Sequence, residues 1–147
     1  MRIALATSSY APYIGGVEEH VRNVARVLRE RGHEVVVWTI DREGGFHVRR
    51  IDGVDVWDLP APLPARSIRA LARLAIALPR AALRWRAAFR AFRPDVIHVH
   101  CFGPNGTYTR VLSERTGVPF VLTGHGETLA DDEGVFTSSR FAQDSLR

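Results

Sequence analysis

The segment that most constrains the fold is a glycine pair between an apolar run and an amphipathic helix. Residues 2–7 form a short β-type run, and Gly15 and Gly16 follow within the segment 12–20. The apolar positions after the pair are Val17, Val21, Val24, Ala25 and Leu28, a spacing that predicts a helix with one buried face. Glycines at such a junction let the backbone approach a ligand, and the N–H groups at the helix start suit phosphate. The pattern predicts a nucleotide- or phosphate-handling α/β domain.

Length and composition are those of one ordinary globular domain. The chain has 147 residues, of which 46% are hydrophobic and 24% charged, enough for a real core. Cys101 is the one cysteine, which excludes an intrachain disulfide and indicates a reducing compartment. We identify no signal peptide and no stretch able to span a bilayer. These features predict a cytoplasmic protein.

The predicted elements alternate between strands and helices along the chain. Strands are expected at 2–7, 34–40, 95–100 and 119–123, the last one buried, with a short strand pair at 47–51 and 54–59 turning at Asp52-Gly53. Helices are expected at 17–31, roughly 66–92 with a break or kink at Pro79, 106–116 and 138–147. This order predicts a doubly wound, mostly parallel sheet with helices on both faces. About five strands are visible where such a sheet usually has about six, so the chain is expected to be a first half.

The basic residues are unevenly distributed. All 20 are arginine, the formal charge is +4, and no acid lies between Asp58 and Asp95. The arginines of that interval are Arg66, Arg69, Arg73, Arg80, Arg84, Arg86, Arg90 and Arg93. Two interpretations stay open: a solvated helix face, or an interfacial helix that binds an anionic membrane surface through a patch around Arg69, Arg73, Arg80 and Arg84. The second would place the protein peripherally at the inner face of the membrane.

Three motifs, in order and spacing, resemble glycosyltransferase family 4 across essentially the whole chain. They are residues 13–18 after the first strand, 94–100, and 123–127. The family has the GT-B fold, in which two Rossmann-like domains enclose the active site. The resemblance implies that residues 1–147 are a truncated N-terminal, acceptor-side domain. The C-terminal domain, which holds the donor through paired glutamates in this family, is expected to be absent from this chain. Alone, this chain is not expected to complete the reaction.

The resemblance also implies an activity. Family members transfer a sugar from a nucleotide-sugar donor to a lipid, sugar or small-molecule acceptor, usually with retention, and many need no metal or other cofactor. Carried over, Gly15 and Gly16 approach the donor diphosphate, and His125 lies near the transferred sugar as the catalytic residue, hydrogen bonding or stabilising charge rather than attacking. The further cleft candidates are Tyr13, Glu18, His20, His100 and Glu127.

Several of these features have simpler explanations. The glycine pair can be a tight turn, and Glu18 and Glu19 partly satisfy the helix dipole themselves. His98 and His100 alternate and so face one side of their strand. Together with Cys101 and His125 they suggest a metal site, but the spacing fits no common zinc pattern, which favours packing and predicts no metal.

Two other classes of protein compete with a transferase. A nicotinamide- or flavin-binding domain would explain Asp41 after the second strand, but the loop lacks the compact G-x-G-x-x-G turn. A stand-alone Rossmann-like module for anionic lipid or nucleotide is the alternative. Nucleic acid is not expected as a partner, because the basic segment lacks the interleaved aromatic residues of single-strand binding platforms.

Overall fold

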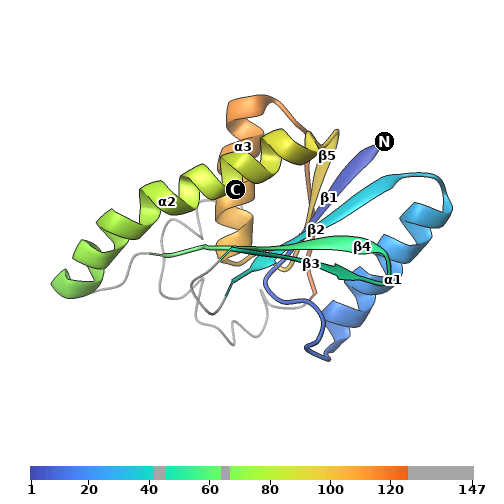
Figure 1. Ribbon diagram of the computed structural model, residues 1–147, viewed down its shortest axis with the longest axis horizontal. Coiled ribbons are helices and arrows are strands. Elements are labelled where there is room, and N and C mark those ends of the chain that lie inside the picture. The colour runs from blue at the N-terminus through green and yellow to red at the C-terminus, as the bar shows by residue number, and fades with distance from the viewer. Residues whose placement is uncertain (42–45, 64–66, 126–147) are drawn as a thin grey trace.

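The computed structural model describes residues 1–41, 46–63 and 67–125, which form a six-stranded sheet and three helices (Figure 1). In chain order they are β1 (Arg2–Thr7), α1 (Gly16–Glu30), β2 (Glu34–Ile40), β3 (His47–Ile51), β4 (Val54–Leu59), α2 (Ile68–Phe92), β5 (Val96–His100), α3 (Pro104–Thr116) and β6 (Phe120–Thr123). The strand order is β3-β4-β2-β1-β5-β6, and only β3 and β4 pair antiparallel. The predicted α/β fold with a mostly parallel sheet is confirmed.

The helices cover both faces of the sheet, as predicted. Val21 and Ala25 of α1 are buried against Leu5 and Val37 on one face. On the other face, Trp85 of α2 and Leu112 of α3 belong to a cluster with Ala6 and Trp38. Each face of the sheet therefore has its own apolar core, and the side chains of every central strand alternate between the two.

Helix α1 has the boundaries that its sequence predicts, within one residue. Gly15 is its extended N-cap, and the helix carries acids in its first turn at Glu18 and Glu19. It ends at Glu30, and Gly32 follows with a φ of +83°, a left-handed conformation that costs glycine little. The start of α1 lies directly after the loop that leaves the carboxyl end of β1.

The strands β3 and β4 form the predicted hairpin. Asp52 and Gly53 have φ angles of 51° and 76°, as a two-residue turn with both central residues left-handed requires. The resulting register pairs His47 with Asp58. It places the antiparallel pair at one edge of an otherwise parallel sheet.

Helix α2 runs without interruption through Pro79, so the predicted break is wrong. Proline removes one backbone donor, but the flanking turns are held independently. Ser67 caps the start by accepting from the Ala70 N–H at 3.2 Å, and Trp85 in the second half is buried with its Nε1 donating to the Pro60 carbonyl at 2.8 Å. Figure 1 shows the first half of α2 extending past the edge of the sheet.

Strand β6 is not the buried strand that its apolar sequence predicts. It lies at the end of the strand order, and Val121 and Leu122 are 46% and 38% exposed. A run of apolar residues shows that a strand suits burial, but not whether neighbouring elements cover it. The helix predicted at 138–147 lies outside the described residues.

Candidate functional site

The candidate site lies at the carboxyl edge of the sheet, where β1 and β5 are neighbours. From β1 the chain passes to β2 on one side, and β5 lies on the other. Open α/β sheets bind ligands outside the carboxyl ends of their strands at such a reversal of strand order. The glycine loop after β1, His100 at the end of β5 and His125 just after β6 all belong to this edge.

The two glycines of the loop differ in their surroundings. A side chain at Gly15 would collide with the Glu18 carboxylate, which folds back over the loop and accepts a hydrogen bond from the Ser9 hydroxyl. A Cβ at Gly16 would meet no atom within 4 Å. Since an acid already occupies the first turn of α1, Gly16 rather than Gly15 is where a ligand can approach the backbone.

Three predicted histidines converge beside this loop. His20 comes from the exposed side of α1, His100 is fully buried, and His125 is partly buried. Their ring centroids lie 4.9 Å apart for His20 and His125, and 5.5 Å from each of these to His100. His100 Nδ1 and His125 Nε2 are 3.2 Å apart. His20 follows Gly16 by four residues, which puts both on one side of the helix.

A fourth histidine, His98, packs against this group through His100. The rings of His98 and His100 are 4.2 Å apart, and His98 Nε2 lies 2.7 Å from the Thr123 hydroxyl oxygen. The two histidines share one face of β5, as their alternation predicts. Because Thr123 pairs with His100 across β5 and β6, this contact fixes the end of β6, from which His125 projects.

Burial keeps the inner histidines neutral. The pKa of His100 falls to about 3, first because burial disfavours its charged form and then because His98, His125 and His20 lie near it. Burial also lowers the pKa of His98, with smaller contributions from His20 and His125. A neutral imidazole has one donor and one acceptor nitrogen, so these rings can take part in hydrogen bonds within the site but supply no positive charge of their own.

The other predicted site residues lie in different places. Tyr13 is 54% exposed on the loop before α1, and Glu127 lies outside the described residues. Arg69, Arg73, Arg80 and Arg84 belong to α2, on the opposite face of the sheet from α1. The structure therefore brings together Gly16, Glu18, His20, His100 and His125, and it leaves the arginine patch as a separate surface.

The sequence did not single out the residues that hold the glycine loop. Arg49 forms a two-point ion pair with Asp58, at 2.7 Å from Nε to Oδ2 and 2.8 Å from Nη2 to Oδ1, and its third nitrogen donates to the Ala11 carbonyl at 2.8 Å. The hairpin thus anchors the start of the loop that carries Gly15 and Gly16. The Asp52-Gly53 turn could have revealed this ion pair from the sequence, because the β3–β4 register that the turn sets makes Arg49 and Asp58 diagonal neighbours.

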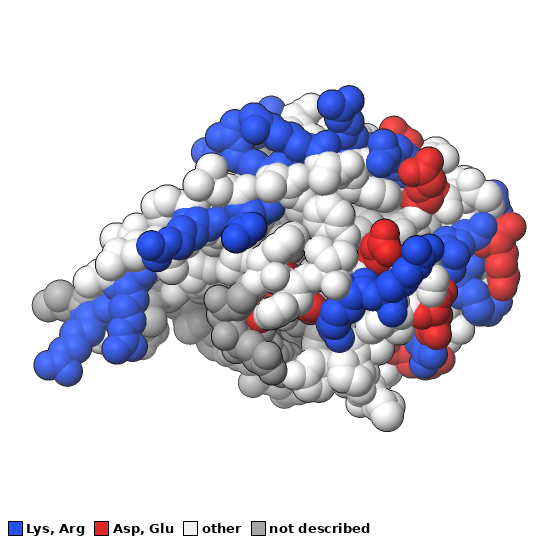
Figure 2. Space-filling model, in the orientation of Figure 1, with Lys and Arg blue, Asp and Glu red and all other residues white. Residues whose placement is uncertain are grey.

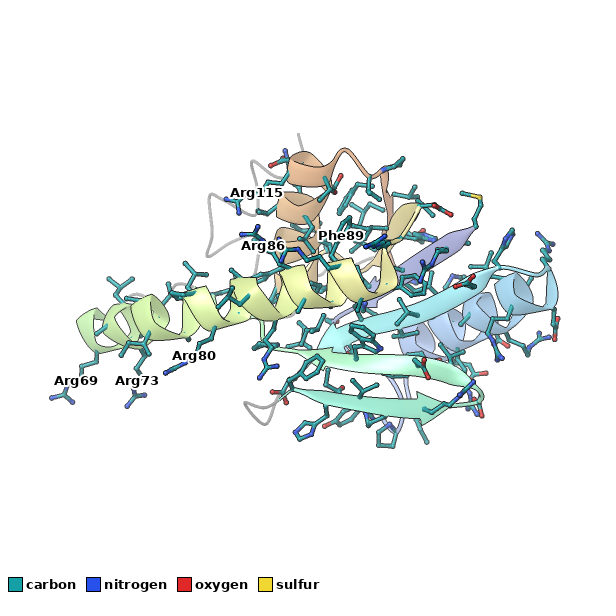
Figure 3. The ribbon with its side chains drawn as sticks, turned by 45° about the horizontal axis from the view of Figure 1, so that its top comes forward. Arg69, Arg73, Arg80, Arg86, Phe89 and Arg115 are labelled. Carbon is teal, nitrogen blue, oxygen red and sulfur yellow. The ribbon has the colours of Figure 1, made fainter. Side chains whose placement is uncertain are left out.

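The α2 arginines form a surface of one charge sign. In Figure 2 the arm that contains the first half of α2 carries basic atoms and no acidic ones. Among the residues that the structure describes, no arginine of α2 forms an ion pair. In Figure 3, Arg69, Arg73 and Arg80 project from one side of the helix and Arg86 from another. Ile76 and Leu83 are 62% and 65% exposed.

Fold and site define an α/β domain whose candidate ligand-binding edge lies at the carboxyl ends of its parallel strands. Residues 15–147 match the family model described as the glycosyl transferase 4-like domain. A GDP-mannose-dependent alpha-mannosyltransferase of Mycolicibacterium smegmatis is 31% identical over 146 residues, which cover 97% of this chain and 37% of that protein. A phosphatidyl-myo-inositol mannosyltransferase of the same organism is 32% identical over 129 residues, covering 87% and 31%.

Comparison with solved structures gives the same fold. Sucrose-phosphate synthase of Thermosynechococcus elongatus superposes with a TM-score of 0.60 at 19% identity, over 97% of this chain and 37% of that one. The chain belongs to the glycosyl transferase 4-like family, and the predicted family is confirmed. It spans about a third of the length of the relatives that it matches. Within the described part of the chain, no helix has the length and apolar character needed to cross a membrane.

Proposed function

We propose that this chain is the acceptor-side, N-terminal domain of a glycosyltransferase that moves a sugar from a nucleotide-sugar donor to an acceptor with retention. A second, donor-binding domain closes the cleft in this account. The observation that carries the proposal is the convergence of His20, His100 and His125 beside Gly16 at the carboxyl edge of the sheet. Family membership supplies the reaction class.

The proposed roles follow from the chemistry of each group. Gly16 gives the donor diphosphate access to the backbone, because no atom lies where its side chain would be. His125 hydrogen bonds the transferred sugar near its reacting carbon. His20 lines the acceptor side of the cleft, with the fully buried His100 behind it. Imidazole nitrogens and an open backbone suit hydroxyl groups and phosphate oxygens. The transfer step in this proposal uses no cofactor.

The chain on its own is expected to bind the donor weakly, because Glu18 occupies part of the glycine loop and most donor contacts belong to the other domain. Titration of GDP-mannose into the isotope-labelled chain, followed by NMR, should shift the signals of Gly16, His20 and His125. Gly16→Ala adds a methyl group that the fold tolerates but the donor does not, and should weaken these shifts. His125→Ala should also weaken these shifts. Its matched control is His47→Ala, on the exposed edge strand β3, which should leave them unchanged. Submicromolar affinity, or shifts confined to another surface, would contradict the assignment.

We further propose that α2 contacts an anionic membrane surface, with the protein in the cytoplasm. Arg69, Arg73, Arg80 and Arg84 follow one another at spacings of four and seven residues, so they share one side of the helix. The exposed Ile76 and Leu83 are seven residues apart and form a neighbouring apolar line. Arginine flanking exposed apolar side chains is the pattern of a helix that lies in a membrane interface. A lipid acceptor, as in the name of the phosphatidyl-myo-inositol relative, would be reached from such a position.

Vesicle sedimentation tests this contact separately from sugar transfer. The chain should pellet with vesicles that contain phosphatidylglycerol, and less with pure phosphatidylcholine, with the difference shrinking as salt rises. Equal pelleting with both lipids, or none, would refute the membrane proposal and leave the glycosyltransferase assignment untouched.

A further inference from the structure

We propose that His20, His100 and His125 form a binding site for one zinc-class divalent metal ion at the carboxyl edge of the sheet. The spacing of histidines along the sequence predicted no such site, and the transfer reaction proposed above does not require one. The site arises because α1, β5 and the segment after β6 each place one imidazole at the same point.

The distances between the ligand atoms fit a metal. Each histidine offers one nitrogen, and the three nitrogens lie within 4.8 Å of one another. His100 Nδ1 and His125 Nε2 are 3.2 Å apart, close to the edge of about 3.3 Å in a tetrahedron with zinc–nitrogen bonds of ~2.0–2.1 Å. His20 needs the largest adjustment, and as an exposed side chain it can rotate toward the other two.

The two ring nitrogens of His100 have different surroundings. His100 is fully buried, and its Nε2 has no hydrogen-bond partner among the described residues. Its Nδ1 lies 3.2 Å from His125 Nε2 and is the ligand atom in this proposal. A metal bound through Nδ1 leaves Nε2 as the nitrogen that carries the ring proton.

The donor set selects the kind of metal. Three imidazoles without a carboxylate suit Zn²⁺, Co²⁺, Ni²⁺ or Cu²⁺, whereas Mg²⁺ and Ca²⁺ prefer oxygen ligands. Three protein ligands leave a fourth tetrahedral position open. Because His20 is exposed, that position faces solvent at the edge of the sheet, where it can take a water or an oxygen atom of a bound molecule.

The ion would be held in place by groups already described. His98 packs on His100 at 4.2 Å between ring centroids and contacts the Thr123 hydroxyl oxygen at 2.7 Å. Thr123 lies two residues before His125 and pairs with His100 between the strands. Two of the three ligands are therefore positioned by neighbouring strands of one sheet, which fixes their spacing before a metal arrives.

Metal titration of the purified 147-residue chain, made without a histidine tag and treated with a chelator, tests the proposal. Calorimetry with Zn²⁺ should show one ion per chain, and Co²⁺ should give the visible absorption of a tetrahedral nitrogen-ligated ion. Added imidazole should change that absorption by entering the fourth position, and Mg²⁺ should not displace the ion.

Variants assign the ligands. His20→Ala and His125→Ala should each weaken Zn²⁺ binding at least about tenfold, since even the loss of a group behind a metal ligand costs that much. His47→Ala, an exposed histidine on β3, should bind as tightly as the parent. His20 is on the surface, so its variant keeps the fold, which circular dichroism verifies. Absence of one-to-one binding, or equal affinity in the His20→Ala and His47→Ala variants, would overturn the site.

Discussion

Helices α1 and α2 lie on opposite faces of one sheet and use arginine in different ways. The α1 arginines bind within the molecule: Arg26 pairs with Glu30 at 2.7 Å, Arg22 with Asp52 at 2.5 Å, and Arg29 donates to the Asp52 carbonyl at 2.8 Å. The α2 arginines have no acidic partner in the described part of the chain. The same residue type therefore ties α1 to the hairpin, whereas on α2 it forms a surface of one charge sign in the described structure.

The largest expected effect separates the inner and outer faces of α2. Trp85→Ala should lower the free energy of unfolding by about 3–5 kcal/mol, because Trp85 is 1% exposed, packs edge-on against Trp38 at 6.0 Å and stacks on Tyr108 at 5.5 Å. Leu83→Ala, at a side chain that is 65% exposed, should change it by less than about 0.5 kcal/mol. Urea denaturation measures both. Similar losses in the two variants would mean that the outer face of α2 is covered.

The next effect concerns the outward arginines. Replacing Arg69, Arg73, Arg80 and Arg84 together with glutamine should weaken binding to anionic vesicles at least about tenfold, since each arginine near such a surface contributes ~1 kcal/mol. Unfolding by urea should be nearly unchanged, because these side chains form no ion pair with the described residues. The change also removes the cation–π contact of the exposed Arg84 guanidinium, 5.0 Å from the Phe46 ring centroid, which contributes about 0.5–1 kcal/mol at most. Arg26→Gln on α1 is the control that should leave vesicle binding intact.

A third prediction uses the pH dependence of stability to test Tyr108 of α3, which stacks on Trp85 at the inner side of α2. Burial raises the pKa of Tyr108 to about 12, and its hydroxyl donates to the Pro62 carbonyl at 2.8 Å. The unfolded chain loses this proton near pH 10 and the folded chain only near pH 12. The stabilisation is therefore complete below pH 10 and is lost as pH rises through 12, by about 2–3 kcal/mol. Tyr108→Phe should remove this part of the pH dependence, measured by urea denaturation between pH 9 and 12; an unchanged slope would contradict it.

The smallest effect tests the α1 pairs. Arg26→Gln should lower the free energy of unfolding by about 0.5 kcal/mol or less, as is usual for an exposed pair four residues apart on a helix. A double-mutant cycle with Glu30→Gln measures the coupling between the two side chains. A coupling above about 1 kcal/mol would show that the α1 arginines stabilise the fold more than their exposure indicates.

Much of the fold could be predicted, because the signals are local. Helical spacing from Val17 onward and Gly32 defined α1, and the Asp52-Gly53 turn defined the hairpin. Local signals failed where the outcome depends on distant packing. The apolar sequence of β6 did not reveal that it lies at the sheet edge, and Pro79 did not reveal that the helix around it would be held by packing on either side.

The candidate site, like the fold, could be predicted from the sequence only in part. The sequence indicated Gly15, Gly16 and His125 through their places after strands, and the resemblance gave them roles. It could not distinguish the covered Gly15 from the accessible Gly16, because the Glu18 side chain decides this by folding over the loop. Nor did the sequence single out Arg49. Its hydrogen bond to the Ala11 carbonyl forms because a loop and a hairpin that are far apart in the chain meet in space.

By itself, the sequence determined the order of strands and helices, the family, and the arginine helix without acids, because periodicity, turn residues and charge are properties of neighbouring residues. Only the tertiary structure decided that His20, His100 and His125 meet. They come from one helix and two strand ends that the parallel β1–β5–β6 pairing brings to a single edge. Spacing along a chain cannot show such a meeting, because the distance between side chains is set by sheet register and helix packing.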